Sequence, residues 1–321
     1  QKGHLHPRSN STQKASHLRP YPMLERVLFF TTLLFVTTTS VFGQFSLHEN
    51  GVTVLCPNVA AGDTGTVNGV LSTKIDARED LIEYSPSNGT VNADVACTSD
   101  VTNMASWFNG KYSFNEDISH WDVSLVTTMQ SMFYNATSNT SIFNADLSKW
   151  DVSSIRNFEN MFSGADSFNA DISEWDVSRA NDMTAMFAQA DAFNVDISGW
   201  DTRLVQEMNG MFQGADIFNQ DIGDWNVSNV GGDHTFVNMF FGAGSFNQDL
   251  SDWCVPNIDE EPSQFSQSSP LSLAHKPQWG RCPVRKLTPT EPANNATNQS
   301  LTPTLRWTED DRASSYEVIV S

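Results

Sequence analysis

The chain has 321 residues and is strongly acidic: 38 Asp and Glu against 18 Lys and Arg give a formal charge of −20 at pH 7. This charge argues against nucleic acids and anionic membranes as partners. Aromatic residues make up 11% of the chain and charged residues only 17%, so the composition favours a packed protein over a disordered acidic tail.

The first part of the chain carries an export signal. A ten-residue apolar run follows Met23, and Val41-Phe42-Gly43 is an acceptable cleavage site. We interpret residues 23–43 as a signal peptide, because ten apolar residues are short for a membrane anchor, which is the alternative. Residues 1–22 do not begin with Met, and we expect them to be translated sequence upstream of the true start. The mature chain is therefore expected to be secreted or displayed at a cell surface, without a transmembrane span.

Six copies of one short sequence occupy residues 104–260. The most regular copy contains Met161-Phe-x-Gly-Ala-x-x-Phe-Asn-x-Asp-Ile-Ser-x-Trp175-Asp-Val-Ser178. Successive tryptophans lie 25 to 29 residues apart, and a period of this length is typical of a solenoid. One unit cannot bury its own aromatic residues, so stability is expected to come from packing between neighbours. The tryptophan column is Trp121, Trp150, Trp175, Trp200, Trp225 and Trp253. The first phenylalanine column is Phe108, Phe133, Phe162, Phe187, Phe212 and Phe240, and the second is Phe114, Phe143, Phe168, Phe193, Phe218 and Phe246.

Each unit is predicted to contain one short helix and one brief strand. Residues 183–190 place apolar side chains at positions i, i+3, i+4 and i+7, which is one face of a helix. A glycine such as Gly164 stands where such a helix would close in a left-handed conformation. Residues 168–173 are long enough only for a brief strand. The fold class expected is α/β: a solenoid resembling leucine-rich repeats, with about six strand–helix repeats and a stacked parallel sheet.

These residues carry a resemblance to a known family. The repeat, over roughly residues 104–259, resembles that of BspA-like bacterial surface proteins, a group related to leucine-rich repeats. Residues 49–69 resemble the lead-in of such proteins, and Trp279-Gly-Arg-Cys-Pro283 resembles their closing segment. The resemblance implies a non-enzymatic protein at the cell surface or outside the cell, associated with adhesion. It does not imply a particular ligand.

Four cysteines flank the repeats, and four permit three pairings. Their arrangement suggests Cys56–Cys97 in an N-terminal cap, residues 44–103, and Cys254–Cys282 at a C-terminal cap, residues 261–286. Each bridge would stabilise the fold by about 3–4 kcal/mol in the chain-entropy model. No two cysteines lie close together in the sequence, so a zinc site of the usual spacing is not expected.

The sequence pattern changes again near the end of the chain. Residues 288–292 read as a linker, and residues 305–307 and 316–320 as two strands. They resemble the beginning of a fibronectin type III-like sandwich, which needs about seven strands. Residues 287–321 are therefore expected to be a linker and a truncated sandwich domain.

Aspartates recur at fixed positions in the repeats and admit two interpretations. Hard cations prefer clustered carboxylates, which makes Asp171, Asp176, Asp196 and Asp201 calcium candidates. An Asp at the same turn of every unit also bonds local backbone groups, which is the structural alternative. The column of asparagines that includes Asn169 resembles the asparagine ladder of leucine-rich repeats. No other metal or cofactor is expected.

Catalytic motifs are absent from the sequence: it has no nucleophile elbow, His-Glu-x-x-His, phosphate loop or Gly-x-Gly-x-x-Gly. We therefore expect no enzyme activity, with two alternatives: a non-catalytic region of a larger secreted enzyme, or a calcium-stabilised structural repeat. Variable positions beside the Asp-Ile-Ser core are candidates for a face that binds a protein or glycan, the alternative being an ordinary solvated face. These candidates are Glu116, His120, Lys149, Glu174, Gln220, Asp224, Gln248 and Asp252.

Overall fold

The computed structural model describes residues 44–82, 91–136, 141–231, 236–283, 289–291 and 306–307. The chain divides into two compact units, residues 1–40 and 41–321, and all described residues belong to the second. The predicted signal peptide and the segment before it lie outside the described residues. Within those residues, no helix has the length and apolar character needed to cross a membrane.

The N-terminal region is built from short strands. The turn Asn68-Gly69 has positive φ at both residues, as a tight hairpin requires, and it joins β3 to β4. Strand β5 pairs parallel to β4, and β1 pairs antiparallel to β2. The elements are β1 (Ser46–Leu47), β2 (Val54–Leu55), β3 (Thr64–Val67), β4 (Val70–Lys74), the 3-10 turns η1 (Arg78–Asp80) and η2 (Ala93–Val95), and β5 (Ala96–Cys97).

The predicted α/β solenoid of strand–helix repeats is wrong. The described part of the chain contains no α-helix; its helical elements are three 3-10 turns, η1, η2 and η3 (Leu273–His275). At residues 183–190 the chain forms tight turns, with Ala185 and Gln189 in the left-handed region at φ 51° and 56°. Two successive four-residue turns are closed by Met186 N–H to Met183 O and by Ala190 N–H to Phe187 O. They produce the same apolar spacing as one helical face, and this explains the error. The brief strand predicted at 168–173 is also absent.

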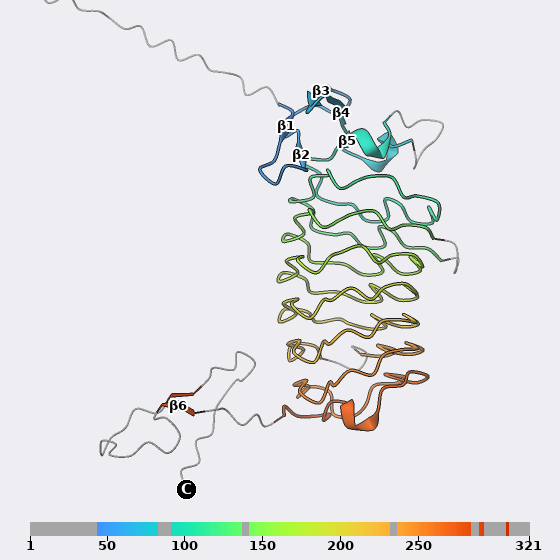
Figure 1. Cartoon of the computed structure of the whole chain (residues 1–321), viewed down its shortest axis with the longest axis vertical. Coiled ribbons are helices and arrows are strands. Elements are labelled where there is room, and N and C mark those ends of the chain that lie inside the picture. Colours follow the sequence, from blue (N-terminus) through green and yellow to red (C-terminus); the bar gives the residue numbers. More distant parts are fainter. Residues whose placement is uncertain are drawn as a thin grey trace, which may run out of the picture. The chain divides into compact units, whose positions relative to one another are not determined.

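The repeats are stacked layers (Figure 1). Backbone hydrogen bonds join each layer to the next. In the segment before each aromatic pair, alternate N–H groups close a local turn or cross to the next layer: Met186 N–H donates to Met183, while Phe187 N–H donates to Met211 at 2.9 Å. Isolated parallel bridges, rather than continuous strands, connect the first five layers from Asn103 to Glu207. The layers approach closely at the glycine column, since a Cβ on Gly164 would collide with the carbonyl oxygen of Asn135.

The core is a stack of aromatic pairs. Within each layer the two phenylalanine rings lie parallel with centroids 3.8–3.9 Å apart. Rings of the first column stack on the next layer at 5.6–5.8 Å. From Trp150 to Trp253, each indole N–H donates to an Ile or Leu carbonyl of the preceding layer at 2.9–3.2 Å. Because these buried donors find partners only across layers, no layer is complete alone.

Both disulfide pairs expected from the arrangement of the cysteines are present. Cys56 is bonded to Cys97 beside β5, and Cys254 to Cys282 after the last aromatic layer. The first joins positions 41 residues apart and the second positions 28 apart.

Residues 261–279 form a seventh layer, here called the closing layer. Phe240 N–H donates to Phe265 O at 2.8 Å, and Gly242 N–H to Gln267 O at 2.9 Å, in the register that joins all earlier layers. Trp279 packs edge-on against Phe265 with ring centroids 5.1 Å apart. The predicted C-terminal cap therefore continues the hydrogen-bond pattern of the repeats.

Beyond the closing layer, β6 (Pro289–Glu291) pairs antiparallel with β7 (Arg306–Trp307), with a register shift in β6. Strand β7 lies in a predicted strand, whereas β6 lies in the predicted linker. The predicted strand at residues 316–320 is outside the described residues, so the fibronectin type III-like domain stays a prediction.

Candidate interaction face

One side of the layers carries a continuous asparagine ladder. The side-chain oxygen of each asparagine accepts the backbone N–H of the residue in the same column of the next layer, at 2.8–3.0 Å. Five of the asparagines are exposed and Asn194 is half-buried, so the ladder lies at the surface. The ladder satisfies backbone donors where the layers have no bridge and fixes the spacing of the face. It consists of Asn115, Asn144, Asn169, Asn194, Asn219 and Asn247, and ends at Ser272.

An aspartate column runs beside the ladder. Asp171 Oδ1 accepts the N–H and the hydroxyl of Ser173 at 3.0 and 2.7 Å, and the other copies make the same N–H bond two residues ahead. Hydrogen bonds from Ser173 lower the pKa of Asp171, and those from Ser198 lower the pKa of Asp196. The ionised carboxylate is therefore the form that these turns stabilise.

The four calcium candidates occupy two such columns. Asp171 and Asp196 stand before the tryptophan, and Asp176 and Asp201 follow it. Each accepts the backbone N–H two residues ahead at 3.0–3.2 Å, and Arg203 also bonds both oxygens of Asp201. Hydrogen bonding from Arg203 lowers the pKa of Asp201. In the part of the chain that the structure describes, no three His, Cys, Asp or Glu side chains gather as a metal site.

Five of the eight variable candidates are exposed at the surface, and three are half-buried. Gln220 Nε2 donates to Asn194 O at 2.8 Å, and Gln248 Nε2 donates to Asn219 O at 2.7 Å. These two glutamines bridge layers, so part of their bonding capacity serves the fold. The exposed candidates are Glu116, Lys149, Glu174, Asp224 and Asp252.

His120, the third half-buried candidate, ties the first repeat to the N-terminal region. Its Nε2 lies 2.9 Å from Ala96 O, to which it donates as N–H, and its carbonyl accepts Val54 N–H at 2.8 Å. Burial lowers the pKa of His120, against the opposing effects of the Ala96 carbonyl, Asp117 and Asp94. His120 thus links the first repeat to the N-terminal region, and its place on a partner face stays a prediction.

A third acidic column was missed in the sequence. Asp166, Asp191 and Asp216 follow the small residue after the glycine position in three successive layers, a regularity visible in the repeat alignment. Burial, then the carboxylates of Asp216 and Asp166, raise the pKa of Asp191. The closing layer was missed too, although Trp279 follows Trp253 by 26 residues, close to the repeat period.

Comparison with known families places these layers in a family. The sequence profile described as "Mycoplasma protein of unknown function, DUF285" matches twice, at residues 87–198 and 170–279. The two matches together cover more than half of the chain. The chain belongs to this family. The matched region ends at Trp279, the last residue of the closing layer. No curated protein and no solved structure matches the chain.

Proposed function

We propose that this DUF285 chain is a non-enzymatic, secreted or cell-surface protein whose repeated layers form an interaction scaffold for a protein or a glycan. The observation that carries the proposal is the face beside the asparagine ladder: fixed Asn and Asp columns run across six layers and alternate with positions whose side chains differ. Such a face is long and regular, which suits an extended partner better than a small molecule.

The chemistry of the face supports recognition through hydrogen bonds. The ladder oxygens and the aspartate turns are held by backbone N–H groups, so their orientation costs little entropy on binding. Lys149 and Glu174 occupy the same column in neighbouring layers and give this column opposite charges in succession. An extended partner can therefore contact a different side chain in each layer.

Three further findings support an extracellular location. The two disulfides are typical of oxidising compartments. The repeat resembles that of BspA-like surface proteins, and the apolar run after Met23 resembles a signal peptide. Adhesion is the activity that this resemblance implies, and it stays part of the proposal.

The proposal is tested by binding the full chain to a panel of immobilised glycans and extracellular proteins. We expect a member of the panel to bind saturably and Glu174→Lys to weaken that binding. Lys149 already occupies this column, so the fold tolerates the change. The matched control is Gln206→Arg, which introduces a residue that Arg156 supplies in the same column of an earlier layer. Equal loss in both variants, or no loss in either, would contradict a role of this face.

A further inference from the structure

The closing layer lacks the aromatic pair that fills every earlier layer. Phe212 N–H donates to Met239 O, and the residue after Met239 is the first-column Phe240. Phe240 N–H donates in the same way to Phe265 O, so the next residue, Ser266, stands in the first phenylalanine column. Ser272 N–H donates to Asn247 Oδ1 at 3.0 Å, which places Leu271 in the second phenylalanine column. The two phenylalanines are thus replaced by a serine and a leucine, and the ring of the neighbouring Phe265 lies edge-on over Phe240 with centroids 5.4 Å apart.

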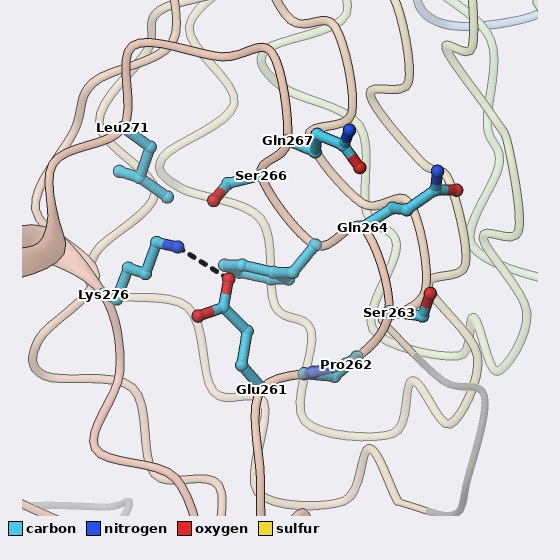
Figure 2. Close-up of a pocket in the computed structure, with 9 residues that line it drawn as sticks. Glu261, Pro262, Ser263, Gln264, Ser266, Gln267, Leu271 and Lys276 are labelled. Carbon is cyan, nitrogen blue, oxygen red and sulfur yellow. Dashed lines mark hydrogen bonds and ion pairs between the residues drawn. The ribbon is translucent and has the colours of Figure 1, made fainter.

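A hollow of about 420 Å³ lies beside Phe265, Ser266 and Leu271 (Figure 2). Its lining residues all belong to the closing layer, and none comes from the sixth layer. The hollow therefore opens on the side of the closing layer that faces away from the repeats. The ion pair between Lys276 Nζ and Glu261 Oε1, at 2.6 Å, lies beside it.

The backbone of the closing layer has hydrogen-bond donors at the same side. In each of the first four layers, four N–H groups of the turn segment cross to the next layer. In the sixth layer three do so, those of Asn238, Phe240 and Gly242. The corresponding N–H groups are those of Gln264, Ser266 and Ser268, and the described residues supply no acceptor for them. Gln264 and Ser268 keep the left-handed φ of their columns, 57° and 64°, so the donors keep the register of a layer. A row of unpaired donors is a template for an added segment of another chain, as at the edge of a sheet.

Charge indicates what kind of segment fits. Asp259, Glu260 and Glu261 are exposed in succession where the closing layer begins, and only Glu261 makes an ion pair within the described residues. The whole chain carries −20. A second copy of this chain would be repelled, whereas a basic segment is attracted.

We propose that the open side of the closing layer is a docking site for a basic peptide segment of a partner protein. The segment adds as an eighth layer in the turn conformation of the other layers: its carbonyls accept the N–H groups of Gln264, Ser266 and Ser268, and an aromatic side chain enters the hollow beside Phe265. This site is separate from the face beside the asparagine ladder and does not depend on the proposed function.

The test is calorimetric titration of the full chain with a synthetic peptide that copies residues 183–193 and carries two lysines at each end. We expect saturable binding with one peptide per chain. Ser266→Phe fills the hollow from within and should weaken binding about tenfold or more, the value of one buried aromatic side chain. The matched control is Ser167→Phe, an exposed position whose column already holds Ile142 and Ile217 and which should leave binding unchanged.

Two further measurements keep the test decisive if Ser266→Phe does not fold. A peptide with its phenylalanines replaced by alanine should bind the unmodified chain about tenfold more weakly. Amide hydrogen exchange of the unmodified chain should slow at residues 264, 266 and 268 when the lysine-flanked peptide is added. No saturable binding, equal binding of the alanine peptide, or protection only beside the asparagine ladder would each overturn the proposal. The Glu174→Lys test of the ladder face is unaffected by any of these results.

Discussion

At the residue scale, most polar side chains of the face are occupied by the backbone. Asn169 Oδ1 accepts a hydrogen bond from Asn194 N–H, and Asp171 Oδ1 accepts one from Ser173 N–H. The same chemistry explains why the Asp and Asn columns recur: each satisfies a backbone donor that turns, unlike strands, leave without a regular partner. Repetition of a carboxylate is therefore explained by local structure before any ligand is invoked.

Removing one ladder side chain should destabilise the fold measurably. Asn169→Ala deprives Asn194 N–H of its acceptor, and we expect a loss of about 1 kcal/mol in the free energy of unfolding. Urea denaturation measures this loss. Ser167→Ala, at an exposed position two residues earlier, is the control and should be neutral; equal effects of the two substitutions would argue against the ladder as a source of stability.

Removing the charge of Asp191 should stabilise the fold, whereas removing the Asn169 side chain should destabilise it, because the fold raises the pKa of Asp191. A raised pKa means that the ionised form costs stability: the cost is absent below the ordinary value of 3.8 and grows as pH rises through the raised pKa. Asp191→Asn should therefore stabilise the chain at neutral pH by about 0.5 kcal/mol, a small gain because the site is partly solvated. The gain should vanish below the ordinary pKa.

Thermal unfolding at neutral and at acid pH measures this difference. Asp176→Asn is the matched control, because Asn226 occupies the same column in another layer and accepts the same N–H at 3.1 Å. If Asp191→Asn lowers the unfolding temperature at neutral pH, the ionised Asp191 carboxylate does not cost stability and its pKa is not raised in the fold.

At the scale of the element, the layer is a sequence of tight turns completed by its neighbours. Left-handed residues at two positions of the turn segment, such as Ala185 and Gln189, direct alternate N–H groups out of the layer. The indole N–H groups do the same from the core. A layer is thus held by bonds that are neither helical nor those of a continuous strand.

Trp200→Phe tests the bond between layers. It keeps an aromatic ring but leaves the Ile172 carbonyl without its 3.2 Å donor in the core, and we expect a cost of about 2 kcal/mol in unfolding free energy. Trp279→Phe, in the half-buried tryptophan of the closing layer, should cost less. Chemical denaturation compares the two, and a larger loss at Trp279 would show that the indole bonds are not what joins the layers.

The sequence predicts the layers better than their internal structure. The period, the two phenylalanine columns and the tryptophan column are readable because buried stacking demands the same residue in each copy. Residues 183–190 misled the prediction because two successive turns and one helical face share the spacing i, i+3, i+4 and i+7. The turns differ from a helix in the positive φ of Ala185 and Gln189. Unlike glycine, alanine and glutamine do not by themselves indicate a left-handed conformation in a sequence. The closing layer was not predicted because Ser266 and Leu271 replace both phenylalanines, and only Trp279 keeps close to the repeat period.

At the scale of the whole molecule, stability comes from aromatic stacking, inter-layer hydrogen bonds and the two disulfides. We therefore expect thermal unfolding of the full chain to be unchanged when an excess of chelator replaces calcium. The four candidate carboxylates already bond backbone N–H groups, and no cluster of three potential ligands occurs within the described residues. Circular dichroism during heating makes the comparison, and a drop of many degrees in chelator would assign calcium a structural role.

The central claim, that partners are recognised by a face spread over many layers, is tested most directly by amide hydrogen exchange of the full chain with a partner from the binding panel. The account predicts slowed exchange in segments that recur with the repeat, around residues 115–120, 144–149 and 169–174 and onward, with little change in the N-terminal region. Protection confined to one layer, or to residues 44–103, would contradict it.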